Sequence, residues 1–166
     1  MIVRPETEKD LAAIQSINVA AFADHPFSHQ TEHLIVNALR DAGALTLSLV
    51  AEDAGEVVGH IAFSPALIDG NDLKWFTLGP IAVAPKRQRQ GIGSRLMEQA
   101  LSELRAMQAE GCVLLGEPAY YGRFGFQAHA GLQLPGVPPG YFLALAFHGP
   151  VPEGIAQYSD AFNAAA

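Results

Sequence analysis

The segment from Trp75 to Met107 constrains the fold more than any other, because a strand pattern, a glycine-bearing turn and a helix pattern follow one another in it. Residues 75–83 are mostly apolar and predict a strand. Gly79-Pro80 interrupts this strand, and since proline donates no hydrogen bond to a ladder, the strand must bend, bulge or lie at an edge there. A helix with one apolar face follows, formed by Ile92, Leu96, Met97, Ala100, Leu101, Leu104 and Met107. The segment therefore predicts a domain that combines strands and helices.

Hydrophobic spacing on either side of this segment predicts the remaining elements. Before it we expect a short strand at residues 2–4, a helix after the capping pair Thr7 and Asp10, a second helix from about residue 28 to 40, and a hairpin of strands at residues 45–51 and 57–64. After it we expect a buried strand at residues 112–115, a short helix from Gly116 through Tyr121, a strand that begins at Phe126, a loop at residues 135–140 and a last strand at residues 141–147.

Charge and cysteine content exclude several classes of protein. The chain has 166 residues, 17 acidic and 10 basic, and a net charge of −7, which argues against general nucleic-acid binding. Its apolar runs are far shorter than the roughly 20 residues of a membrane span, and its first residues lack a signal-peptide pattern. Cys112 is the single cysteine, so neither a disulfide within the chain nor a cysteine cluster for zinc is possible. We therefore expect one domain in the cytoplasm.

Residues 88–95, which we call the phosphate loop, predict an anion site. Glycine at positions 91 and 93 lets backbone N–H groups approach a ligand, and the start of the following helix adds unpaired donors and a partial positive charge. Four of the ten basic residues lie in or beside this loop, namely Lys86, Arg87, Arg89 and Arg95. A Walker loop is excluded because no lysine follows Gly93, and the three-glycine dinucleotide fingerprint is absent. Taken alone, the same pattern also fits an ordinary helix start with a flexible turn.

Two motifs give the chain a family resemblance. Val83-Ala84-Pro85-x-x-Gln88-x-x-Gly91-x-Gly93 resembles the acetyl-CoA-binding motif of the GNAT superfamily, and residues 121–126 (YGRFGF) resemble a second block near the end of those domains. Residues 78–83 further resemble a small bacterial stand-alone subgroup. The resemblance implies the GNAT acyl-CoA N-acyltransferase fold, an α/β (α+β) fold with a mixed, mostly antiparallel sheet flanked by helices in the order βααβββαβαββ and splayed between its fourth and fifth strands. The domain would span residues 1–148, followed by a tail at 149–166 of unassigned role.

The resemblance also implies how acetyl-CoA would be held as co-substrate. Backbone groups of the central strand would pair with the pantetheine arm, and the N–H of Ile81 or Ala82 would polarise the thioester carbonyl. The phosphate loop would hold the diphosphate. The implied cofactor-binding residues are Ile81, Ala82, Val83, Gln88, Arg89, Gln90, Gly91, Ile92, Gly93, Ser94 and Arg95.

Catalytic roles follow from the same resemblance, with one departure. Tyr121 would be the general acid for the leaving thiolate, the alternative being a packing residue. Many relatives carry a glutamate on the central strand, but residues 75–83 contain no acid. The candidates for the general base are therefore Glu117, His60 and Asp72, or water. A helix cap is the alternative role of Glu117, and a core or surface position that of His60.

The acceptor is not readable from the sequence. We expect an N-acetyltransferase acting on an amine of a small molecule or a protein, with no metal, no membrane and no nucleic acid; a homodimer is compatible with the resemblance. Phe22, Phe27 and His29 fall where the family places its acceptor-binding loop. The histidines at 25, 29 and 33 also have helical spacing, but Pro26 interrupts them. A CoA-binding domain without turnover, acting as a sensor or interaction module, is the alternative function.

Overall fold

The computed structural model describes residues 1–26 and 28–164. Their contacts group into two units, the first formed by residues 1–64, 79–101 and 160–164 and the second by residues 65–78 and 102–159. Strands β3 (Glu56–Ile68) and β4 (Asn71–Val83) each run from one unit into the other, as does helix α3 (Ile92–Ala106).

In the first unit, neighbouring strands follow the order β1-β2-β3-β4. β1 (Ile2–Pro5) pairs antiparallel with β2 (Leu47–Asp53), and β2 pairs antiparallel with β3. The helices are α1 (Leu11–Phe22), α2 (Glu32–Asp41) and the first part of α3, with single 3-10 turns at Glu8–Asp10, Pro85–Arg87 and Asp160–Asn163. The predicted capping pair is present, since the Thr7 backbone N–H donates to Asp10 Oδ2 at 2.7 Å.

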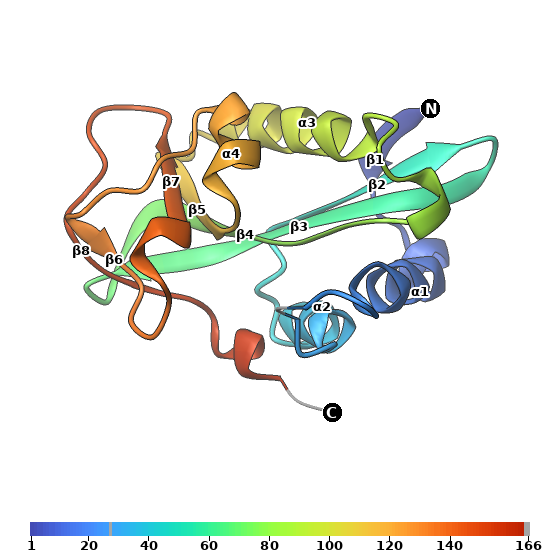
Figure 1. Cartoon of the computed structure of the whole chain (residues 1–166), viewed down its shortest axis with the longest axis horizontal. Coiled ribbons are helices and arrows are strands. Elements are labelled where there is room, and N and C mark those ends of the chain that lie inside the picture. The colour runs from blue at the N-terminus through green and yellow to red at the C-terminus, as the bar shows by residue number, and fades with distance from the viewer. Residues whose placement is uncertain (27, 165–166) are drawn as a thin grey trace. The chain divides into compact units, whose positions relative to one another are not determined.

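Two adjacent residues of β3 show how helices cover both faces of this unit. Side chains alternate between the faces of a strand, so Gly59 and His60 face opposite ways. His60 contacts Asn18 of α1, whereas a Cβ added to Gly59 would lie only 2.9 Å from Leu96 of α3. Glycine at position 59 thus lets α3 pack directly on the sheet, on the face opposite α1 and α2 (Figure 1).

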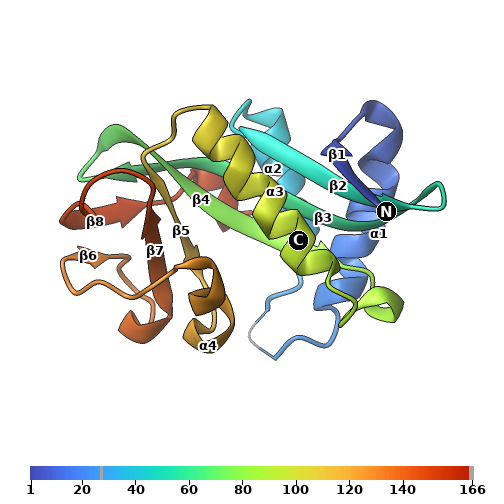
Figure 2. The ribbon, with the colours of Figure 1, turned by 90° about the horizontal axis from the view of Figure 1, so that it is seen from above.

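In the second unit, β4 pairs parallel with β5 (Gly111–Leu115), which pairs antiparallel with β7 (Phe142–Ala146). β8 (Gly154–Gln157) pairs with the end of β3 and with β6 (Leu132–Gln133), as Figure 2 shows. Helix α4 (Pro118–Tyr121) follows β5 and continues into a 3-10 turn at Gly122–Phe124; another turn spans Pro139–Tyr141. The unit's core contains Ala66, Ile68, Trp75, Val113, Leu132, Phe142, Ala144 and Ala156.

The ladder between β4 and β5 ends where the sequence predicted an interruption. Its last pair is Thr77 with Val113, two residues before Gly79, which has a φ of +145°. β5 goes on to pair with β7 as far as Leu115. The mostly antiparallel sheet flanked by helices confirms the expected fold class, and the pairing of β4 with β5 is limited to residues 75–77 of β4.

Two expectations about elements were wrong, and one strand was not predicted. No strand begins at Phe126; Gln127 forms only an isolated bridge with Ala144, because Gly125 takes a left-handed φ of +99° that ends the preceding turn. The second helix begins at Glu32 rather than near residue 28. A further strand, β8, lies in the tail at 149–166, which the sequence left without an element.

In the part of the chain that the structure describes, no helix is both long and apolar enough to cross a membrane. The cytoplasmic location, the domain boundary at 148 and a homodimer stay predictions.

Candidate active site

The phosphate loop has the backbone geometry of an anion site. Helix α3 begins at Ile92, and Arg95 N–H donates to Gly91 O at 3.1 Å. The N–H groups in the helix's first turn therefore have no acceptor within the helix, and they carry its partial positive charge. Gly91 has a φ of +82°, and no heavy atom would lie within 4 Å of a Cβ there, so the loop is open on that side.

The four basic residues in or beside the loop differ in whether they are ion-paired. Arg87 donates to Asp53 Oδ2 at 2.5 Å and to Gln90 Oε1 at 3.2 Å, which ties the phosphate loop to the end of β2. The other three are Lys86, Arg89 and Arg95, and within residues 1–26 and 28–164 none of them has an ion-pair partner. These three are exposed or nearly so and can attract an anion.

The exposed side chain of Gln88 ties the phosphate loop to the end of β4. Its Nε2 donates to the carbonyl of Val83 at the end of β4, at 3.1 Å, and Gln90 Nε2 donates to Lys86 O at 3.4 Å. Both glutamines thus stabilise the loop's shape through their amides. In β4 itself, Ala82 is buried while Ile81 and Val83 are half-buried.

Tyr121 lies at the end of α4 in the second unit. Its ring packs edge-on against Tyr120, with centroids 4.9 Å apart, and against Phe126 at 6.2 Å. Burial, with a smaller contribution from Tyr120, raises the pKa of Tyr121 to about 12. The phenol is therefore protonated at neutral pH, and among the described residues its hydroxyl has no hydrogen-bond partner.

Glu117 and Asp72 differ in whether their carboxylates accept a hydrogen bond from the protein. Glu117 is exposed at the N-cap of α4, and its backbone carbonyl accepts from Tyr120 and Tyr121 while its side chain makes no capping bond. The capping role considered for this side chain is therefore not seen. Asp72 is the second residue of β4, where its Oδ1 accepts from the Lys74 N–H at 3.0 Å.

His60 is completely buried and both of its ring nitrogens have protein partners. Nε2 lies 2.9 Å from Ser48 Oγ, and Nδ1 lies 3.3 Å from Asn18 Nδ2. Because Asn18 Nδ2 also donates to the Ile14 carbonyl, its amide is oriented so that Nδ1 accepts and Nε2 carries the proton. Desolvation by burial lowers the pKa of His60 to about 4, so the ring is neutral at neutral pH.

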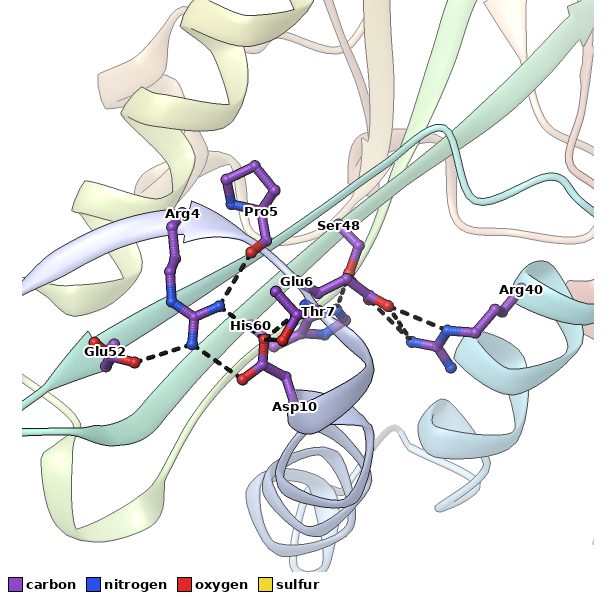
Figure 3. A network of polar contacts seen from close by, with 9 residues as sticks. All are labelled: Arg4, Pro5, Glu6, Thr7, Asp10, Arg40, Ser48, Glu52 and His60. Atoms are coloured by element: carbon purple, nitrogen blue, oxygen red, sulfur yellow. Dashed lines mark hydrogen bonds and ion pairs between the residues drawn. The ribbon is translucent and has the colours of Figure 1, made fainter.

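His60 is one end of a polar network that the sequence did not reveal (Figure 3). Ser48 Oγ donates to Glu6 Oε1, and Arg40 binds the Glu6 carboxylate through two nitrogens, Nη2 at 2.9 Å and Nε at 3.2 Å. A pocket of about 400 Å³ opens beside Glu6, Arg40 and Ser48. Since the Ser48 hydrogen is directed to Glu6 and not to His60, Ser48 and His60 do not form a nucleophile–base pair.

A second cluster stands next to this network. Arg4 donates to both oxygens of Asp10, at 2.7 and 3.0 Å, and to Glu52 at 2.9 Å. These bonds hold the pKa of Asp10 down at about 2 although the side chain is buried. The cluster fixes β1 to β2 and to the start of α1.

The expected acceptor loop is only partly described. Phe22 packs against His25 with ring centroids 5.9 Å apart, and His29 is exposed; Phe27 lies outside the described residues. Within the residues described, no three histidine, cysteine, aspartate or glutamate side chains are grouped as they would need to be to hold a metal ion.

Comparison with known proteins gives consistent matches. Residues 45–128 match the family described as the acetyltransferase (GNAT) domain. The chain is 35% identical to YhbS of Escherichia coli, described as an uncharacterized N-acetyltransferase, over 98% of this chain and 99% of YhbS. A crystal structure of a GNAT family acetyltransferase from Brucella melitensis in complex with acetyl-CoA is 48% identical, with a TM-score of 0.88 and 97% of each chain covered. The structure of YhbS in complex with CoA has a TM-score of 0.84 at 33% identity, covering 98% of this chain and 92% of the other.

Proposed function

The chain belongs to the GNAT acetyltransferase family, and from that premise we propose that it transfers an acetyl group from acetyl-CoA directly to a primary amine of a small molecule or a protein. The observation that carries the proposal is the phosphate loop, where first-turn N–H groups, an open Gly91 and unpaired cations lie together. That donor set fits a diphosphate. The acetyl-CoA and CoA complexes of the two relatives support the same ligand here.

The central strand supplies the second part of the proposed site. β4 has no β5 partner in the ladder beyond Thr77, so its last residues have an edge at which an extended ligand can pair. We assign the pantetheine arm to the backbone groups of Ile81 and Val83. The N–H of Ile81 or Ala82 would then polarise the thioester carbonyl and stabilise the oxyanion that develops on it.

Tyr121 is the proposed acid, and its pKa limits how it acts. The amine nitrogen attacks the thioester carbon, the C–S bond breaks, and the sulfur leaves as a thiolate. A thiol has an ordinary pKa near 8.5, so complete transfer from a phenol of pKa about 12 would be uphill by about 5 kcal/mol if the thiolate kept that value. Tyr121 therefore stabilises the departing sulfur chiefly as a hydrogen-bond donor, and the proton that finally makes the thiol is replaced from solvent.

The amine must lose a proton in the same reaction, and the geometry favours Glu117 over His60 for this task. Glu117 is exposed, its carboxylate has no described partner, and it precedes Tyr121 by one helical turn. Both nitrogens of His60 are occupied and its side chain is fully buried. The proton taken by Glu117, or by water in its place, passes on to solvent.

The experiment is a panel of amines assayed by release of free thiol from acetyl-CoA. The panel contains spermidine, lysine, an aminoglycoside and a short peptide with a free N-terminus. With the fastest amine, Tyr121→Phe should lower kcat by about 10- to 100-fold while the calorimetric Kd for acetyl-CoA changes less than about twofold. Tyr120→Phe is the matched control and should keep near wild-type kcat. Full activity in Tyr121→Phe would remove this residue from the mechanism.

The second candidate is a CoA-binding sensor that does not turn over. The absence of an acid between residues 75 and 83 favours it. It predicts tight binding of acetyl-CoA by calorimetry with no thiol release from any amine in the panel, whereas a single amine that is acetylated excludes it.

A further inference from the structure

We propose that Gly116 is a positioning residue for Tyr121: the absence of a side chain at position 116 fixes where the phenol points. The inference rests on the proposed role of Tyr121 in acetyl transfer. It adds a residue that lies outside both motifs on which the family resemblance is based.

The contact between the two residues leaves no room for even one more carbon. A Cβ added to Gly116 would lie 2.7 Å from Tyr121 Cδ2 and closer still to Cε2. Carbon atoms in proteins do not approach this closely, so the ring and a side chain at position 116 exclude each other. The backbone of Gly116 is not in the left-handed region, so the ring itself is the obstacle to an alanine.

Gly116 cannot easily move away from the ring. Its N–H donates to Tyr141 O at 2.9 Å, directly after the β5–β7 ladder. Tyr121 is held by further contacts, because its ring packs against Phe126 and its N–H donates to Glu117 O at 3.0 Å. The rings of Tyr120 and Phe126 pack against the Tyr121 ring and oppose its rotation about χ2, which alone would leave the hydroxyl in place. An alanine at 116 must therefore swing the whole ring about χ1 or shift α4, and either change displaces the hydroxyl at the far end of the ring.

The test compares Gly116→Ala with Gly122→Ala. Gly122 caps the same short helix and has no positive φ, and an added Cβ there would have no atom within 4 Å. Gly122→Ala therefore makes the same glycine-to-alanine change in the same helix but introduces no clash. A displacement near 1 Å can cost about 100-fold in rate, so we expect kcat with the fastest amine of the panel to fall at least about tenfold in Gly116→Ala. The Kd for acetyl-CoA and the kcat of Gly122→Ala should stay within about twofold of wild type.

A double-mutant cycle distinguishes positioning from a general structural effect. If Gly116 acts through the hydroxyl of Tyr121, Gly116→Ala should have little further effect on kcat in a Tyr121→Phe background. Additive losses would overturn the inference. Should Tyr121→Phe itself keep full activity, the proposed role of Tyr121 fails; should Tyr121→Phe lose activity while Gly116→Ala keeps it, only the present inference fails.

Two further measurements keep the test independent of the acceptor and of folding. The ring of Tyr121, followed by NMR of tyrosine labelled with ¹³C, should stay protonated at pH 10.5 in the wild type and ionise at lower pH in Gly116→Ala, because a displaced ring is less buried. Phe126→Leu removes a ring that packs against Tyr121 without adding a clash, and it should also lower kcat. An unchanged titration, or wild-type kcat in both variants, would overturn the inference.

Discussion

Replacing His60 by glutamine should remove about 2 kcal/mol of the stability that the protein loses between pH 7.5 and pH 5.0. The side chain has an exposed fraction of 0%, and it meets Ser48 on one ring nitrogen and Asn18 on the other. The charged groups nearest to it are Glu6, which favours its protonation, and Arg40, which opposes it. Desolvation is the largest effect, it outweighs Glu6, and together with Arg40 it lowers the pKa from 6.5 to about 4.

The sign and size of the effect follow from this lowered pKa. Between pH 6.5 and pH 4 the unfolded chain binds a proton at His60 and the folded protein does not, so acid favours unfolding in this window. Each pKa unit of difference between the two states corresponds to about 1.4 kcal/mol. The free energy of unfolding should therefore fall by about 2 kcal/mol between pH 7.5 and pH 5.0 on account of His60, and by about 3 kcal/mol once the folded pKa is passed.

Urea unfolding followed by circular dichroism measures this difference. His60→Gln should be less stable than the wild type at pH 7.5, because glutamine does not reproduce the hydrogen bonds that the two ring nitrogens make with Ser48 and Asn18. The decisive quantity is the change from pH 7.5 to pH 5.0, which should be about 2 kcal/mol smaller in the variant at equal m-values. The contributions of other titrating groups to the pH dependence are the same in both proteins and cancel in the comparison. Asp10, with its pKa of about 2, titrates below this pH range. Equal pH dependence in both proteins would refute the reasoning.

Two predictions concern the phosphate loop. Gly91→Val forces a branched side chain into a φ of +82° and should weaken acetyl-CoA binding by about tenfold or more in calorimetry, whereas Gly70→Val carries similar backbone strain at a φ of +77° in the β3–β4 turn and should leave the Kd unchanged. Asp53→Asn releases Arg87 and should raise the Kd for CoA by about two- to fivefold, as expected for the loss of a partly exposed ion pair. Removing a negative charge near an anion site would by itself lower the Kd, so tighter binding would contradict the tethering role.

The sequence predicted the parts of the site that are set by local backbone chemistry. The apolar period from Ile92 to Met107 and the glycines before it predicted a helix that opens at the phosphate loop, and α3 begins there, at Ile92. Gly79-Pro80 predicted an interruption of β4, and the ladder with β5 stops two residues earlier, at Thr77. Both features depend on residues close together in the chain, for which spacing is informative.

Features that depend on distant contacts escaped prediction. β8 has only four residues, begins at a glycine with a φ of +143°, and pairs with residues 67 and 68 of β3. The partners of His60 lie 12 and 42 positions away, so its burial could not be read from its neighbours in the sequence. The same holds for Gly116, whose role appears only once the Tyr121 ring is placed against it.

Burial has one consequence for both Tyr121 and His60, the two buried titratable candidates for catalysis. It raises the pKa of Tyr121 and lowers that of His60, so each side chain is held in its neutral form across the physiological range. Neither residue changes charge between about pH 5 and pH 10. If the proposed reaction depends on pH in that range, the dependence must come from the attacking amine or from an exposed base such as Glu117, and the pH profile of kcat/KM then reports on the acceptor as much as on the protein.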